Sequence, residues 1–236
     1  MDSYAEYQPP APARGLLACL WSRRVAGTGP GERRIVPDGC VDVIWFRDTG
    51  ELLVAGPDTR AHLTHLAGGD LVGARFRPGR SPAVLGVPAH ALRDERVDLA
   101  SVWHPARTRR LADSLAAAAS PRTVLADAVL DEVREAPDPS VPAMLALARE
   151  GTRVSTMADE IGLTERQLHR RCLTAFGYGA KVLQRVLRFD RAMDLARDGT
   201  ELADVAYLAG YADQAHLSRE VRALAGVSPT ELLRSA

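Results

Sequence analysis

The amino-acid sequence predicts an α+β protein, in which a β-rich N-terminal domain with helices precedes an all-α domain. Two patterns indicate this fold class. Between 33 and 80 short apolar runs alternate with Gly and Pro, as in strands joined by turns; after Pro88 apolar residues recur at intervals of three and four, as in helices. A third observation, a pattern that recurs after 48 residues near the C-terminus, predicts two copies of a helix-turn-helix motif.

The composition is typical of a soluble globular protein long enough for two domains: the chain has 236 residues, of which 46% are hydrophobic and 25% charged. Three widely spaced cysteines without a C-x-x-C pair favour neither a disulfide framework nor a zinc finger. The longest apolar run near the start, GLLACLW, is too short for a signal sequence or a membrane span. We therefore expect a cytoplasmic protein with no membrane partner.

Changes of composition divide the chain into four parts. We predict an N-terminal segment at 1–32, a β-rich domain with trailing helices at 33–135, a linker at 136–142 and a helical domain at 143–236. In the β-rich domain, RRIVPDGCVDVIWF and ELLVAG are joined by DTG, which is a hairpin signal. The linker, APDPSVP, holds three prolines in seven positions, and a helix interior does not accommodate them.

The helical domain contains one pattern twice, at 157–180 and 205–229. Each copy has an apolar helix with an alanine, a glycine four residues later and a second helix that is polar on its outer face. The alanines, Ala158 and Ala206, allow two helices to cross closely, whereas the glycines can adopt the left-handed backbone of a tight turn. Each copy is therefore predicted to be a helix-turn-helix unit.

The second helix of each copy exposes side chains suited to reading DNA. In the major groove, Arg pairs with guanine O6 and N7, and Gln pairs with adenine N6 and N7. The predicted outward side chains are Arg166, Gln167, His169 and Arg170 in the first copy and Gln214, Ala215, His216, Ser218 and Arg219 in the second. A solvated face would explain one such helix. Two copies at one repeat distance, each with an outward Arg, favour DNA recognition.

A helix of about 17 residues, KVLQRVLRFDRAMDLAR, joins the two copies. At about 1.5 Å per residue it spans roughly 25 Å, which holds two recognition helices near the roughly 34 Å between successive major-groove faces. The whole chain has no net charge, but 164–197 carries eight basic and three acidic side chains. We predict that Lys181 and Arg185 contact phosphates; the alternative is a solvated face.

Residues 150–234 resemble the DNA-binding domain of AraC/XylS-type transcriptional regulators. The residues that match its C-terminal signature are Gly210, Tyr211, Asp213, Ala215, His216, Leu217, Ser218, Arg219, Gly226, Ser228 and Pro229. Val221 and Cys172 each replace a common Phe, and GYGAK replaces the usual G-x-S-P-K. The resemblance implies seven helices, two helix-turn-helix motifs and sequence-specific binding to promoter DNA.

The N-terminal half resembles a domain that is attached to some of these regulators. In that family the N-terminal β-rich domain, often cupin-like, senses a ligand or mediates dimerisation. The resemblance therefore implies double-stranded promoter DNA and an unidentified small-molecule effector as partners. RNA polymerase and a second copy of the chain are further candidate partners.

The strand CVDVIWF places a carboxylate among apolar neighbours. Alternation puts Cys40 and Asp42 on one face and Trp45 on the other. A carboxylate in such surroundings needs a partner, and Arg75 or Arg77 can supply it. One interpretation is an effector pocket made by these five residues. The other is a structural Asp that holds a turn or a buried Arg.

We predict that the protein is not an enzyme and that it needs no metal or cofactor. The histidines His62, His65, His90 and His104 do not follow the usual cupin metal pattern, because H-x-x-H stands without a nearby Glu. Cys40 lacks neighbours that would lower its pKa. The alternative is a cupin-type metalloenzyme fused to a DNA-binding domain.

Overall fold

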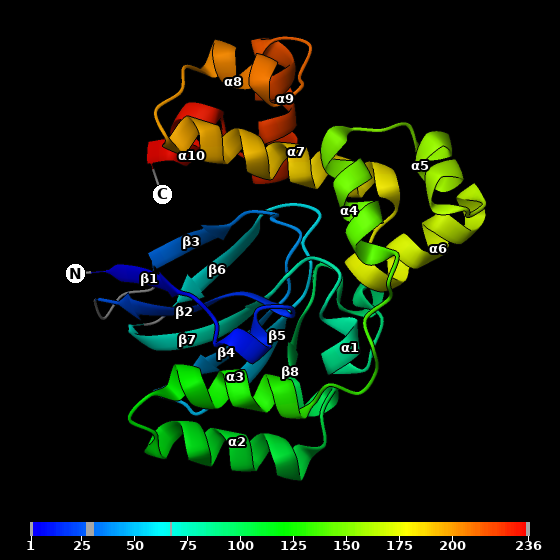
Figure 1. Ribbon diagram of the computed structural model, residues 1–236. Coiled ribbons are helices and arrows are strands. Elements are labelled where there is room, and N and C mark those ends of the chain that lie inside the picture. The colour runs from blue at the N-terminus through cyan, green and yellow to red at the C-terminus, as the bar shows by residue number, and fades with distance from the viewer. Residues whose placement is uncertain (1, 27–30, 67, 235–236) are drawn as a thin grey trace.

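The computed structural model describes residues 2–26, 31–66 and 68–234 (Figure 1). Its N-terminal part holds a six-stranded antiparallel sheet in the order β1-β2-β7-β4-β5-β8 and a two-stranded sheet, β3-β6. The strands are β1 (Ser3–Tyr7), β2 (Leu17–Val25), β3 (Gly31–Ile35), β4 (Asp42–Phe46), β5 (Leu52–Ala55), β6 (His62–Leu66), β7 (Gly69–Phe76) and β8 (Arg96–Asp98).

The sheet begins earlier than the sequence analysis expected. The predicted N-terminal segment at 1–32 is not separate, because β1 and β2 are the first two strands of the large sheet, and β2 lies between β1 and β7. Leu17, Leu20 and Trp21 are buried there, so this segment contributes apolar surface to the domain. The Pro-rich start does not indicate strands, and β7, which pairs with β2, lies about fifty residues further along the chain. No local pattern therefore predicts this pairing.

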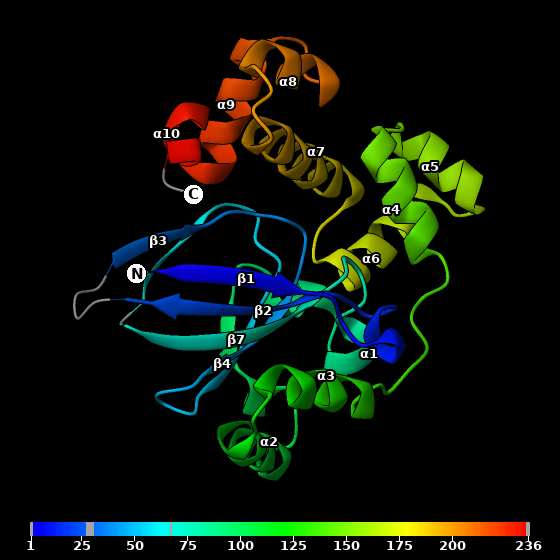
Figure 2. The same ribbon diagram turned by 60° about the vertical axis from the view of Figure 1, so that its left-hand side comes forward.

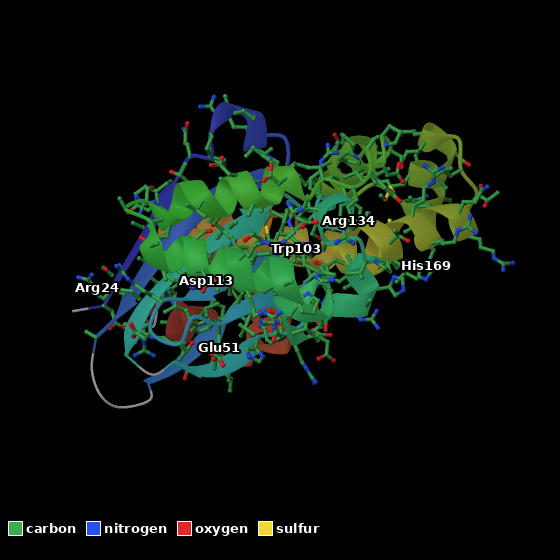
Figure 3. All side chains as sticks on the ribbon, turned by 90° about the horizontal axis from the view of Figure 1, so that it is seen from below. Arg24, Glu51, Trp103, Asp113, Arg134 and His169 are labelled. Atoms are coloured by element: carbon green, nitrogen blue, oxygen red, sulfur yellow. The ribbon has the colours of Figure 1, made fainter. Side chains whose placement is uncertain are left out.

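Two helices cover one face of the large sheet, as Figure 1 and the view from below in Figure 3 show. They are α2 (Pro105–Ala117) and α3 (Pro121–Asp131), and the one-turn helix α1 (Pro82–Leu85) precedes them. The core between sheet and helices includes Val43 and Trp45 of β4, which have no exposed surface, together with Leu115 of α2. The predicted alternation of β4 is confirmed, because its remaining side chains face the other side and are only partly buried.

The C-terminal part is all-α, as the fold class predicted, and contains seven helices in the part that the structure describes. They are α4 (Val141–Glu150), α5 (Val154–Ile161), α6 (Glu165–Phe176), α7 (Ala180–Arg197), α8 (Leu202–Leu208), α9 (Gln214–Ala225) and α10 (Pro229–Arg234). The expected linker, 136–142, overlaps α4, because a helix accepts Pro142 in its first turn.

The long helix α7 belongs to two hydrophobic cores. Leu183 and Val186 pack with α4, α5 and α6, whereas Phe189 and Met193 pack with α8, α9 and α10. The buried apolar side chains of this helix are therefore divided between two units. We call them the first unit (α4 to α6) and the second unit (α8 to α10). No helix among the described residues combines the length and the apolar character needed to cross a bilayer.

Candidate DNA interface and effector cavity

The first unit holds its second helix, α6, by a turn whose chemistry is readable in the sequence. Gly162 ends α5 with φ 71°, in the left-handed region where a Cβ is costly. Thr164 then caps α6, because its hydroxyl accepts a hydrogen bond from the Gln167 N–H at 3.2 Å, and the Gln167 side chain accepts from the Thr164 N–H at 2.9 Å. This capping box fixes the direction in which α6 leaves the turn.

All four side chains predicted to face outward from α6 are exposed, but they differ in their contacts. Arg166 and Arg170 have no ion-pair partner among the described residues, so both guanidinium groups are available to a ligand. The Gln167 amide oxygen already belongs to the capping box, and bidentate pairing with adenine needs that oxygen. His169, labelled in Figure 3, lies over Gly179 in the turn after α6.

The second unit repeats this arrangement with a different cap. Asp213 replaces the threonine and accepts a hydrogen bond from the His216 N–H at 2.6 Å, whereas Gly210 takes φ 79° in the turn. His216 is half-buried: its ring packs edge-on against Tyr211, and its Nδ1 accepts a hydrogen bond from the Ala212 N–H at 3.4 Å. This histidine therefore braces the turn that holds α9.

The remaining predicted side chains of α9 lie on its outer side. Gln214, Ala215 and Arg219 are exposed, and Ser218 is half-buried. The guanidinium of Arg219 has no ion-pair partner in the part of the chain that the structure describes. Arg222, one turn further, is also exposed on α9. The sequence analysis did not single it out, although its spacing of three from Arg219 was the available signal.

One of the two predicted phosphate contacts, Arg185, has an ion-pair partner within the protein. Arg185 of α7 forms an ion pair with Glu220 of α9, with Nε and Oε2 at 2.8 Å. Beside it, the Arg188 guanidinium lies over the Tyr211 ring, 4.8 Å from its centroid, and 3.9 Å from the Glu220 carboxylate. Because Glu220 supplies the counter-charge, Arg185 ties α9 to α7. Lys181 of the same basic row is exposed.

The predicted effector pocket of the N-terminal domain does not assemble as one site. Asp42 accepts hydrogen bonds from Trp21 Nε1 at 2.7 Å and from Arg75 Nε at 3.3 Å. Burial raises the pKa of Asp42, and the Arg75 guanidinium opposes that shift. Trp45 points to the opposite face, into the core, and Arg77 donates to the Arg14 carbonyl at 2.8 Å. The structure thus favours the alternative interpretation, in which Asp42 is a structural residue that holds an Arg, here the half-buried Arg75.

A cavity of about 780 Å³ lies instead where the N-terminal domain meets both helical units. Cys40 and Arg77 of the predicted pocket line it, together with Asp38. The helical residues that line it come from the end of α4, the middle of α7 and the end of α8: Ala148, Arg149, Glu150, Gly151, Gln184, Leu187, Arg188, Asp190, Arg191, Asp194, Tyr207, Leu208, Ala209 and Gly210. A molecule bound there would contact three parts of the protein at once.

Two groups that line this cavity have unusual protonation behaviour. Burial, with the nearby Asp194 and Asp38 carboxylates, raises the pKa of Asp190 to about 7, although Arg197 and Arg75 partly oppose the shift. Burial also raises the pKa of the Cys40 thiol well above its ordinary value, and Asp38 adds to this. The thiol is therefore protonated at neutral pH and is a poor nucleophile.

Two family models match separate parts of the chain. Residues 157–235 match a helix-turn-helix domain, and residues 5–98 match a domain of unknown function (DUF6597). The first match begins within α5 and includes α6 to α10, and the second begins within β1 and includes the other strands of the large sheet. No curated protein matches the chain.

Solved structures with a similar arrangement include ToxT from Vibrio cholerae O395, with a TM-score of 0.48, 11% identity, and coverage of 100% of this chain and 97% of that chain. ToxT from the same strain bound to (E)-4-(8-methylnaphthalen-1-yl)but-3-enoic acid has a TM-score of 0.47 and 12% identity, covering 100% of this chain and 98% of that chain. At TM-scores below 0.5, these likenesses identify neither a ligand nor a target for this chain.

Proposed function

We propose that this protein, whose residues 157–235 form a helix-turn-helix domain of the AraC type, regulates transcription by sequence-specific binding to promoter DNA. The observation that carries the proposal is the duplication. Two units with the same positive-φ glycine in the turn lie along one helix, α7, and each exposes from its second helix at least one arginine that has no ion-pair partner among the described residues. We assign base recognition to α6 and α9, each in a major groove.

The side chains divide this task by their chemistry. Within the described part of the chain, Arg166, Arg170 and Arg219 have no ion-pair partner, and their guanidinium groups fit the two acceptors of guanine, whereas Lys181 is suited to phosphate. Asp213, and not Gln214, caps α9, so the Gln214 amide can pair with adenine. Phosphate contacts release counterions, so the affinity falls steeply as the salt concentration rises.

The test is selection of bound duplexes from a random pool, followed by titration of the selected duplex and of an unrelated duplex. We expect a clear preference for the selected sequence. Arg170→Ala and Arg219→Ala should each cost about 1–3 kcal/mol and relax the preference at different positions. The matched control is Arg109→Ala, which removes the same charge from the exposed side of α2. Equal affinity for both duplexes would contradict the proposal.

We further propose the cavity between the three parts as the site of a small-molecule effector. A ligand that contacts α4, α7, α8 and the N-terminal domain binds one relative placement of the two units better than another, and so shifts the population toward it. Asp190 has no ion-pair partner among the described residues. A protonated amine on the ligand would pair with it and lower its pKa.

Thermal-shift measurements with a panel of amino-containing and purely acidic metabolites test this site. We expect stabilisation by an amino compound, loss of that stabilisation in Asp190→Asn, and its retention in Asp113→Asn, which changes an exposed carboxylate on α2 (Figure 3). A shift that survives Asp190→Asn would place the effector elsewhere, and the absence of any shift would count against an effector.

The metalloenzyme alternative needs a centre of His, Cys, Asp or Glu ligands. Among the described residues no group of three or more such side chains is placed to hold a metal ion, and the family match indicates a DNA-binding regulator. Binding to RNA polymerase and formation of a homodimer stay predictions.

A further inference from the structure

One loop of the N-terminal domain contacts both the first unit and the second unit. The loop at 56–61 joins β5 to β6. Near its start, Pro57 lies against Gly177, the residue that ends α6; a Cβ at 177 would stand 2.6 Å from the proline Cγ. At its end, the Ala61 N–H donates to the Leu224 carbonyl in the last turn of α9, at 2.6 Å. The same short segment therefore touches the C-terminal ends of both recognition helices.

Two arginines of the same domain contact carbonyl groups at the C-terminal ends of these helices. Arg93 Nη1 donates to the carbonyl of Gly177 at 3.3 Å, and Arg34 Nη1 donates to the carbonyl of Ala225 at 2.6 Å. Gly177 and Gly226, which follow the last helical residues, correspond to each other in the repeat, and both have positive φ. The last carbonyls of a helix lack partners within it and carry partial negative charge, so a guanidinium there is doubly favourable.

The loop is held rigidly on the sheet. Asp58 and Arg96 of β8 form a bidentate pair, with Nη2 and Oδ2 at 2.6 Å and side chains only 8% and 18% exposed. The Asp94 carboxylate accepts hydrogen bonds from the Thr59 N–H at 2.7 Å and from its hydroxyl at 2.8 Å. A forked Arg–carboxylate pair fixes orientation as well as distance, so the loop is a firm support.

The two helical units have separate hydrophobic cores and share α7. A bend in one helix would change the distance between α6 and α9. The N-terminal domain adds a second connection: β3 lies beneath α9 and α10 in Figures 1 and 2, and Arg93 reaches α6 from the segment before β8. Supports at both ends restrict the freedom that α7 alone would leave.

We infer that the N-terminal domain is a spacer that sets the separation of α6 and α9, and that Arg34 and Arg93 are its positioning residues. The domain thereby determines which distance between two half-sites the protein accepts on DNA. This inference rests on the proposed function, because it needs both helices to read bases. It assigns to the N-terminal domain a part in sequence selection that requires no effector.

The test uses the full chain and the duplex that it selects from a random pool. One or two base pairs are inserted between the half-sites, each adding about 3.4 Å of length and a rotation, and the dissociation constants are compared. We expect an insertion to weaken binding of the unchanged chain by at least tenfold. In Arg34→Gln/Arg93→Gln the same insertion should cost less than threefold, because α7 can then adjust.

Arg60→Gln is the matched control, since Arg60 is exposed on the same loop and the described residues provide it with no ion-pair partner. It should keep the full penalty for insertion. Arg34→Gln and Arg93→Gln are also measured singly, and each should reduce the penalty for insertion in part. The single variants keep the test decisive if the double variant does not fold. If the insertion weakens binding of the selected duplex by the same factor in all variants, the N-terminal domain is not a spacer. Failure of the unchanged chain to select any sequence overturns the proposed function instead.

Discussion

The two helix-turn-helix units share a backbone plan but use their charges differently. Leu168 and Leu217 fill equivalent buried positions, and Arg170 and Arg219 equivalent exposed ones. The next residue is Arg171 in the first unit but Glu220 in the second. Arg171 contacts the Asp138 carboxylate before α4 at 3.3 Å, whereas Glu220 joins α9 to α7.

This difference shows which part of a repeated motif is fixed by the fold and which part is free to vary. The apolar residues and turn glycines do the same work in both copies, because the crossing of two helices has one geometry. The charged position one residue after the arginine has no such constraint. It pairs with whatever the surrounding structure offers, so each unit is fastened to the rest of the molecule in its own way.

The largest expected effect tests the shared part. Leu168→Ala and Leu217→Ala each remove a side chain with no exposed surface and should lower the free energy of unfolding by about 2–5 kcal/mol. Denaturant unfolding measures both. Leu208→Ala, at a side chain that is 45% exposed on α8, should cost much less. A large loss in one unit and none in the other would show that the two cores are not equivalent.

The caps should have intermediate and similar effects. Thr164→Ala removes the hydroxyl that caps α6, and Asp213→Ala removes the carboxylate that caps α9. Each should lower the free energy of unfolding by about 1 kcal/mol. Hydrogen exchange at the first turns of the two helices locates the loss. Unchanged exchange in α9 of Asp213→Ala would mean that its cap contributes nothing.

The ion pairs that differ between the two units should have a smaller and salt-dependent effect on the free energy of unfolding. Glu220→Gln releases Arg185 and should destabilise the second unit by about 0.2–1 kcal/mol, because the pair is partly exposed. Arg171→Gln should have a similar effect on the first unit. A double-mutant cycle between Arg185 and Glu220 measures the coupling, which should shrink at high salt. A coupling free energy of zero would show that the ion pair between Arg185 and Glu220 does not stabilise the second unit.

A pH-dependent effect concerns Asp190, on α7 between the two units. An aspartate in an unfolded chain titrates near 3.9, whereas Asp190 in the folded protein has a pKa of about 7, so the folded state binds more protons between these values. The free energy of unfolding should therefore fall as the pH rises from about 4 to about 7, and this contribution is level above that range. Asp190→Asn should be more stable than the unchanged chain at pH 8, by comparison of denaturation midpoints. The opposite order would contradict the assigned pKa.

Sequence reasoning succeeded where a local pattern determines the structure. The turn glycines follow from a rule that acts over a few residues, and the structure shows both with positive φ. The helix-turn-helix domain is confirmed by the family match. The alternation of β4 was predicted for the same reason, since a strand face repeats every second residue.

Sequence reasoning failed for contacts between residues that lie far apart along the chain. The pairing of β2 with β7, the fastening of Arg185 by Glu220 and the cavity between three parts all depend on residues distant in sequence. Trp45 was grouped with Asp42 although the same alternation places them on opposite faces, so that grouping contradicted its own signal. No local pattern indicated the contact of Arg34 with the end of α9.

The central claim is that α6 and α9 read two half-sites on one duplex. Methylation interference at guanine N7, on the duplex selected by the full chain, tests it most directly. We predict two groups of sensitive guanines about one helical turn apart, with Arg170→Ala erasing one group and Arg219→Ala the other. A single group of guanines that depends on only one of these arginines would contradict the account.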